Sequence, residues 1–412
     1  MQKKNHPNKL RALIEEAGIP MRELATETDI PEQTLYWYAA GHGIIPRERR
    51  VKLAHVIGCD AQDLAPMHDV EESPHVRKDM TIKRRELLRL LGIAGGALLV
   101  SDIDMERLDA SLANPIYTNA SVVSDLETIT NRCWNLYLAS VSKPSVLDGV
   151  LGQLNMQTQF LNESHPPEVR QGLCAVTSNM SQLAGEIFFD LHDHDAAQSC
   201  YLFAATAAKE AKAYDLWASA LIRHSYLPIF NGQHENALPM LKLAERIALR
   251  GDSAFPTRYW AAATYAEAES GVGNSKACQR ALERAGEVHH IAGTRPPAWT
   301  RFDGSRLAAL QGACYVRLKE PALAMPVLEK ALQQQTNSSR RRGMILSDLA
   351  VASIQQGQIE NACTYANELV NISAQLSSGF LRSNLAQIQQ QLTPFSVSTP
   401  VKSLEKHIAT LS

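Results

Sequence analysis

The densest group of side chains that could bind a metal or carry a reaction is the segment Asp190-Leu191-His192-Asp193-His194-Asp195. Imidazoles and carboxylates are common metal ligands. On a helix, however, two histidines at i and i+2 do not share a face, so only a loop could bring them together. The segment also has the composition of a polar turn between two helices, with an aspartate capping the second helix. We expect a turn with no metal or cofactor, and a metal site is the alternative.

No other pattern in the sequence indicates catalysis. GxSxG, HExxH, Walker-type and dinucleotide-binding motifs are absent. The seven cysteines are scattered without a CxxC pair, which is typical of small core residues in a reducing compartment. We therefore assign no catalytic residue and predict that the protein is not an enzyme.

Composition indicates a helical protein of several domains. The chain has 412 residues, of which 45% are hydrophobic and 20% charged, with frequent Ala, Leu and Gln. These values exclude collagen-like, disordered and disulfide-scaffold proteins. The net charge of −2 indicates neither a nucleic acid nor a membrane as partner. The predicted fold class is all-α.

Residues 8–64 have the pattern of four or five short helices. Leu10 and Ile14 share one face of the first helix, and Pro20 begins the second. The third helix follows Pro31, and the fourth follows Pro46 and ends at Gly58. Small Ala25 would let the second helix cross the third closely. This layout is that of a helix-turn-helix domain.

The motif residues resemble the Cro/cI-type, or XRE, family of DNA-binding domains. They are Leu24-Ala25, Ile30-Pro31-Glu32-Gln33-Thr34-Leu35, Gly41, Pro46, Leu53-Ala54, Ile57-Gly58 and Asp63-Leu64. The chain departs from the family at Asp29, where glycine is usual, and at Ala39, where an acidic residue is usual. The resemblance implies that the third helix enters the major groove of double-stranded DNA. The DNA-binding residues that it implies are Glu32, Gln33, Thr34, Tyr36, Trp37 and Arg47.

Two observations leave alternatives open for this domain. One of Tyr36 and Trp37 could pack in the core instead of contacting a base. Residues 1–70 contain nine basic and ten acidic side chains, a net charge of −1 that is unfavourable for binding phosphates. The rival interpretation is a protein-docking module that does not bind DNA.

The chain changes character over residues 71–120, which we interpret as a linker. Arg84-Arg85 precede an apolar run from Leu90 to Val100, an arrangement similar to a twin-arginine export signal. Eleven residues are too few to span a bilayer as a helix, and the run lies far from Met1. We expect a buried linker helix in a cytoplasmic protein, with no membrane partner. An exported helical-repeat protein is the alternative.

From residue 121 to 392 a helical pattern recurs. Small residues recur at Ala197, Ala237, Ala277, Ala324 and Ala362, with spacings of 40, 40, 47 and 38. A mostly small residue precedes each by twelve positions, and an apolar or small residue follows it by four. The pattern resembles the tetratricopeptide repeat, which implies a solenoid of helix pairs. A helical bundle without repeats is the competing interpretation.

The tetratricopeptide resemblance implies a concave face, lined by the first helix of each pair, that binds peptides or protein segments. The motif positions that face this groove nominate the following effector-binding residues: Asn179, Gln182, Tyr226, Tyr259, Arg306 and Arg317. Asn, Gln and Arg suit the amides and carboxylates of a peptide.

The sequence as a whole predicts a DNA-binding domain at 1–70, a linker at 71–120, helical repeats at 121–392 and a tail at 393–412. In architecture it resembles bacterial peptide-sensing regulators. That resemblance implies a sequence-specific transcription regulator that is a homodimer and binds a peptide or protein effector.

Overall fold

The computed structural model consists of helices joined by short connections, with no strand among the residues that it describes. The described residues are 10–17, 19–28, 30, 32–39, 45, 47–57, 59, 64, 103–114, 117–140, 144–290, 297–300, 302–334, 338–376 and 378–410. The chain divides into two compact units, Met1–Met80 and Thr81–Ser412. The predicted all-α class is confirmed for the described part of the chain.

The first unit contains four helices around a small apolar core. They are α1 (Leu10–Ala17), α2 (Met21–Thr28), α3 (Glu32–Ala39) and α4 (Arg47–Ile57). Leu24, Ile30 and Leu35 are buried where α2 and α3 meet, and Ala25 packs against the same core. The guanidinium of Arg49 on α4 donates to the Tyr38 hydroxyl on α3 over 2.9 Å. The apolar spacing in the sequence therefore identified these four helices and much of their core.

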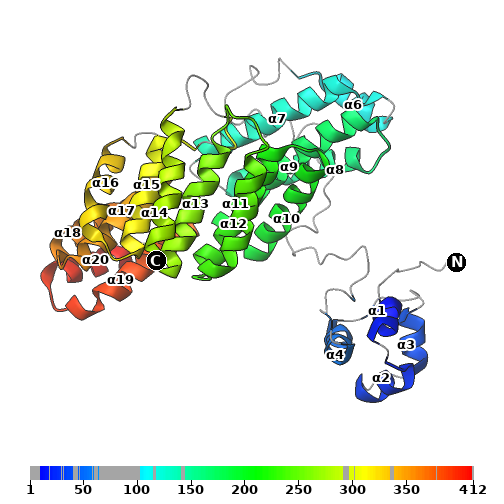
Figure 1. Ribbon diagram of the computed structural model, residues 1–412, viewed down its shortest axis with the longest axis horizontal. Helices are drawn as coiled ribbons and strands as arrows, with labels where there is room; N and C mark the ends of the chain where they lie inside the picture. The colour runs from blue at the N-terminus through cyan, green and yellow to red at the C-terminus, as the bar shows by residue number, and fades with distance from the viewer. Residues whose placement is uncertain are drawn as a thin grey trace. The chain divides into compact units, whose positions relative to one another are not determined.

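The second unit is a series of helices that follow one another along the stack in Figure 1. In chain order they are α6 (Met105–Ala113), α7 (Ala120–Ala139), α8 (Pro144–Leu161), α9 (Pro167–Asp190), α10 (His194–Glu210), α11 (Tyr214–Phe230), α12 (His234–Ala248), α13 (Thr257–Val272), α14 (Ser275–Gly286), α15 (Gly304–Arg317), α16 (Pro321–Gln334), α17 (Ser339–Gln355), α18 (Ile359–Gln375), α19 (Gly379–Leu392) and α20 (Thr399–Ala409). Two short 3-10 helices, η3 (Glu287–His290) and η4 (Thr393–Phe395), extend α14 and α19.

The helices of this unit form two layers. From α7 to α19, each odd-numbered helix packs against the next odd-numbered helix, which makes these helices one continuous layer. From α9 to α18, each even-numbered helix packs on the odd-numbered helices before and after it. Stacked antiparallel pairs of this kind define a helical-repeat domain. The predicted stacking of helix pairs is confirmed.

The same turn recurs after the odd-numbered helices from α9 to α17. In each turn one residue has a left-handed backbone, and these residues are His192, Gly232, Gly273, Lys319 and Gly357. The N–H of the next residue donates to a carbonyl five positions earlier, as from Asp193 to Phe188 and from Gln358 to Ser353. This is the hydrogen-bonding pattern of a Schellman helix end. Five equivalent turns show that the sequence repeat is a structural repeat.

The small residues in the sequence pattern lie where paired helices cross. A Cβ on Gly185 of α9 would lie 2.5 Å from Cε1 of Tyr201 on α10. Gly312 of α15 lies in the same way against Leu328 on α16. Both pairs are sixteen residues apart, as the repeat pattern predicts. Larger side chains at these positions would push the helices apart.

The helical-repeat unit extends beyond the predicted boundaries at both ends. Within the predicted linker, α6 buries Leu108, and Arg107 donates to the Asp125 carboxylate on α7 over 3.0 Å. Within the predicted tail, α20 buries Val401 and Leu404 and packs against α18. These short helices lack the repeat pattern, so the sequence periodicity did not include them. The segment 81–100 lies outside the described residues.

Candidate functional site

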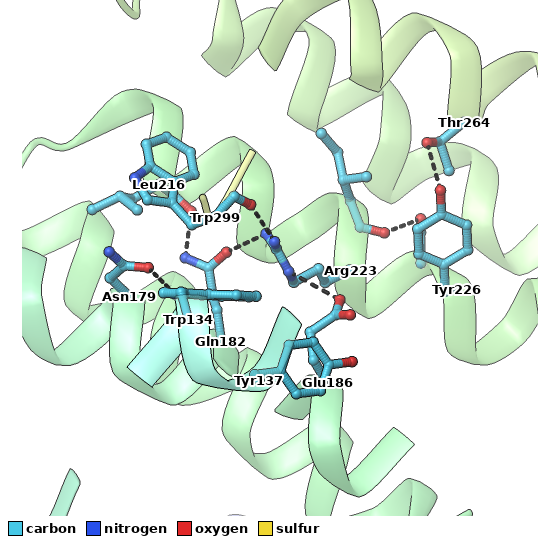
Figure 2. A network of polar contacts seen from close by, with 12 residues as sticks. Trp134, Tyr137, Asn179, Gln182, Glu186, Leu216, Arg223, Tyr226, Thr264 and Trp299 are labelled. Atoms are coloured by element: carbon cyan, nitrogen blue, oxygen red, sulfur yellow. Dashed lines mark hydrogen bonds and ion pairs between the residues drawn. The ribbon is translucent and has the colours of Figure 1, made fainter. Parts of the chain in front are cut away.

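The odd-numbered helices carry a polar network centred on Arg223 of α11 (Figure 2). Its guanidinium donates from Nη1 to the Gln182 side-chain oxygen over 2.8 Å, and its Nε lies 3.0 Å from Glu186 Oε1. Nη2 donates to the main-chain oxygen of Trp299, in the connection between α14 and α15. Three segments distant in sequence therefore meet at one arginine.

Two indole rings enclose the same guanidinium. The Arg223 Cζ lies 5.1 Å from the ring centroid of Trp134 on α7 and 4.8 Å from that of Trp260 on α13. Only 4% of the arginine is exposed. Burial lowers its pKa, and the Glu186 carboxylate acts in the opposite direction. A buried guanidinium with this many partners is fixed in orientation.

Two of the predicted effector-binding residues belong to this network. Asn179 accepts from the Trp134 indole N–H over 2.8 Å, and Gln182 donates to the Leu216 carbonyl over 3.1 Å. Both side chains are buried. In the structure their polar groups therefore bind other parts of the same domain. Their role in effector binding stays a prediction.

The other four predicted effector-binding residues lie nearer the surface of the same layer. The Tyr226 hydroxyl is 3.3 Å from that of Thr264, and Tyr259 is half-buried beside the core of α13. The guanidinium of Arg306 lies 4.8 Å from the ring centroid of Trp260. Arg317 donates to Glu267 over 2.8 Å, at a second polar cluster. Arg306 thus shares the Trp260 ring with Arg223, Tyr226 follows Arg223 by three residues on α11, and Arg317 belongs to the second polar cluster.

The sequence prediction missed Arg223, Trp134 and Trp260. Arg223 directly follows the apolar residues Ala220, Leu221 and Ile222 in the sequence. A charge beside core positions of a helix is buried only when it is paired, so this pattern was a usable signal. The two tryptophans could not be found in this way, because apolar positions on a helix give no indication of a stacked cation.

The segment Asp190–Asp195 forms the turn between α9 and α10. Asp193 caps α10 by accepting from the Ala196 N–H over 3.1 Å, and His192 has the left-handed backbone of the repeated turn. In the described part of the chain, no group of three or more His, Cys, Asp and Glu side chains could hold a metal ion. The seven cysteines are all described, and five of them are buried. Their predicted place in the core is confirmed for those five.

The predicted DNA-contacting residues lie on α3 and α4 of the first unit. Glu32 at the start of α3 is exposed, and Thr34 is partly exposed. The side chains of Gln33, Tyr36, Trp37 and Arg47 lie outside the described part of the structure. Their assignment to DNA therefore stays a prediction.

Comparisons with solved protein structures find chains similar to this one. No family model matches the chain, and no curated protein matches it. A solved structure described as the crystal structure of Rap protein complexed with Competence and Sporulation Factor matches with 11% identity and a TM-score of 0.44. The match covers 79% of this chain and 97% of that chain. Among the described helices, none is both long and apolar enough to cross a membrane.

Proposed function

We propose that this chain is a sequence-specific transcription regulator whose helical-repeat unit binds a peptide or protein effector. The first unit would bind double-stranded DNA through α3, and the regulator would act as a homodimer. The observation that carries the effector proposal is the surface of the odd-numbered helices. Polar and aromatic side chains from α7, α9, α11, α13 and α15 meet there around Arg223.

This surface suits an extended peptide for two physical reasons. Successive odd-numbered helices lie side by side, so a bound chain could contact several of them in turn. Side chains such as Gln182 and Arg223 are held by hydrogen bonds to each other, which lowers the entropy lost when a ligand binds nearby. Tyr226 and Arg306 add partly exposed donors.

The DNA-binding proposal is supported by the arrangement of the first unit. Helices α2 and α3 pack closely around Leu24, Ile30 and Leu35, and the Arg49–Tyr38 hydrogen bond joins α4 to α3. An exposed Glu32 at the start of α3 agrees with a helix whose first turn reads bases.

Selection from a random double-stranded DNA library by the full-length protein tests this proposal. We expect enrichment of a two-fold symmetric sequence, with affinity that falls steeply as salt increases. The mass of the protein in solution should correspond to a dimer. A library that stays random after repeated selection would contradict the DNA-binding role.

One observation favours a second candidate function, a scaffold whose first unit docks another protein. Residues 1–70 have a net charge of −1, whereas most DNA-binding domains are basic. The same selection separates the two functions, because a docking module enriches no sequence at any salt concentration.

A further inference from the structure

Arg306 lies in the first turn of α15, where a positive charge destabilises the helix. It is the third residue of α15, where the partial positive charge of the helix N-terminus opposes a cation. The cap of this helix is Asp303, whose side chain accepts from the backbone N–H of Arg306 over 2.9 Å. The helix cap therefore uses the backbone N–H of Arg306 and not its guanidinium.

The guanidinium of Arg306 also differs from its neighbours in having no carboxylate partner. Arg223, Arg317, Arg340 and Arg342 each form an ion pair with a described Asp or Glu. Arg306 forms no ion pair with any described Asp or Glu. Its guanidinium instead contacts the Trp260 ring, with Cζ 4.8 Å from the ring centroid. The undescribed segments next to α15 and α17, residues 291–296, 301 and 335–337, contain no Asp or Glu.

A second cation lies on the same indole. The Cζ atoms of Arg223 and Arg306 are each 4.8 Å from the Trp260 centroid. Glu186 pairs with Arg223, and the nearby positive charge of Arg306 acts to lower the pKa of Arg223. Arg223 is enclosed, but Arg306 is partly exposed.

An arginine stacked on an aromatic ring is well prepared to bind an anion. Stacking holds the guanidinium plane, while its N–H donors point outward in that plane. A carboxylate can then accept two parallel hydrogen bonds without ordering the arginine first. A ligand of this charge would also offset the repulsion between the two arginines.

We infer that Arg306 binds a carboxylate group of the effector, supplied either by an acidic side chain or by the free C-terminus of a peptide. This inference rests on the proposed peptide-binding function and adds the chemical class of the group that is recognised. Trp260 and Arg223 act as positioning residues. The Trp260 ring orients the Arg306 guanidinium, and Arg223 adds a second positive charge on the same ring.

Two pools of random synthetic heptapeptides, one with free C-termini and one amidated, provide the test. Each pool is passed over immobilised full-length protein, and the retained peptides are quantified and sequenced by mass spectrometry. The variant Arg306→Gln is compared with Arg280→Gln, a matched change at an exposed arginine on α14. Thermal unfolding of both variants checks that they fold.

We expect the wild type to retain peptides that carry a carboxylate, and Arg306→Gln to retain about tenfold less. Arg280→Gln should match the wild type. Loss of retention on amidation identifies the C-terminus as the group, and enrichment of Asp and Glu in both pools identifies a side chain. Equal retention by wild type and Arg306→Gln would overturn the inference but leave peptide binding intact. No retention of either pool by the wild type would overturn both.

Discussion

Arg340 on α17 forms an ion pair with Asp190 on α9, although three odd-numbered helices separate the two along the chain. The other oxygen of Asp190 accepts from the Ser378 hydroxyl, just before α19, over 3.0 Å. Arg340 also donates to the Tyr137 hydroxyl on α7 over 3.4 Å. The row of odd-numbered helices therefore curves enough for its late members to contact its early ones, on the side where Arg223 lies.

Removing the cation from this contact should destabilise the repeat unit. Asp190 has 1% of its side chain exposed, so Arg340→Met leaves a buried carboxylate with Ser378 as its remaining hydrogen-bond donor. We expect the free energy of unfolding to fall by about 3 kcal/mol. Urea unfolding followed by circular dichroism measures it.

Arg342→Met is the matched control for that change. The Arg342–Glu368 pair, at 3.0 Å, has 39% and 46% of its side chains exposed. Its loss should cost less than about 1 kcal/mol, because water solvates both groups. Equal effects of the two substitutions would show that the buried Asp190 contact contributes no more to stability than an exposed ion pair.

A methyl group at the crossing of α9 and α10 should also destabilise the repeat unit. In Gly185→Ala the new Cβ would meet the buried ring of Tyr201, which cannot move without disturbing the core. Overpacking of this kind costs about 1–3 kcal/mol. Gly286→Ala on α14 is the control, because a Cβ there meets no atom within 4 Å. A melting temperature that falls equally in both variants would contradict close packing at Gly185.

The helix pairs could be predicted from sequence because their determinants are local. Gly185 and Tyr201, or Gly312 and Leu328, are separated by one turn between two adjacent helices. The same spacing recurs in every unit, so the pattern is visible without knowledge of the overall curvature.

The candidate site was less predictable because its contacts are distant in sequence. Arg306 and Tyr226 could be assigned to the correct layer from their repeat positions. The partners of Arg223 and Asp190 depend on how far the layer curves and on where the connection carrying Trp299 returns. That connection gives the longest spacing in the repeat, 47 residues, which indicated an insertion but not its contacts.

The second polar cluster should make stability depend on pH near neutrality. Burial raises the pKa of the Asp348 carboxyl to about 7, a shift that Arg317 opposes and Glu267 reinforces. The folded protein therefore binds this proton more tightly than the unfolded chain, whose aspartate has a pKa of about 3.9. Asp348 consequently favours folding more at pH 5 than at pH 8, and its contribution is lost as pH rises through about 7.

Asp348→Asn should remove this part of the pH dependence. We expect the variant to be more stable than wild type at pH 8 and to lose less stability between pH 5 and pH 8. Melting temperatures at the two pH values give the comparison, and Glu360→Gln, at an exposed carboxylate on α18, is the control. A wild-type pH profile in Asp348→Asn would mean that another group titrates in this range.

The last prediction concerns how α3 would read DNA. Gln33 is the second residue of α3, in the turn that a helix-turn-helix domain directs at base edges. A glutamine there can form two hydrogen bonds to an adenine, so Gln33→Ala should cost about 1–3 kcal/mol at the selected sequence. Affinity for random DNA, which depends on phosphate contacts, should change little. Thr26→Ala, at an exposed position on α2, should leave both affinities unchanged. Titrations of the full-length variants with selected and random duplexes measure these effects, and equal losses on both duplexes would exclude base reading by Gln33.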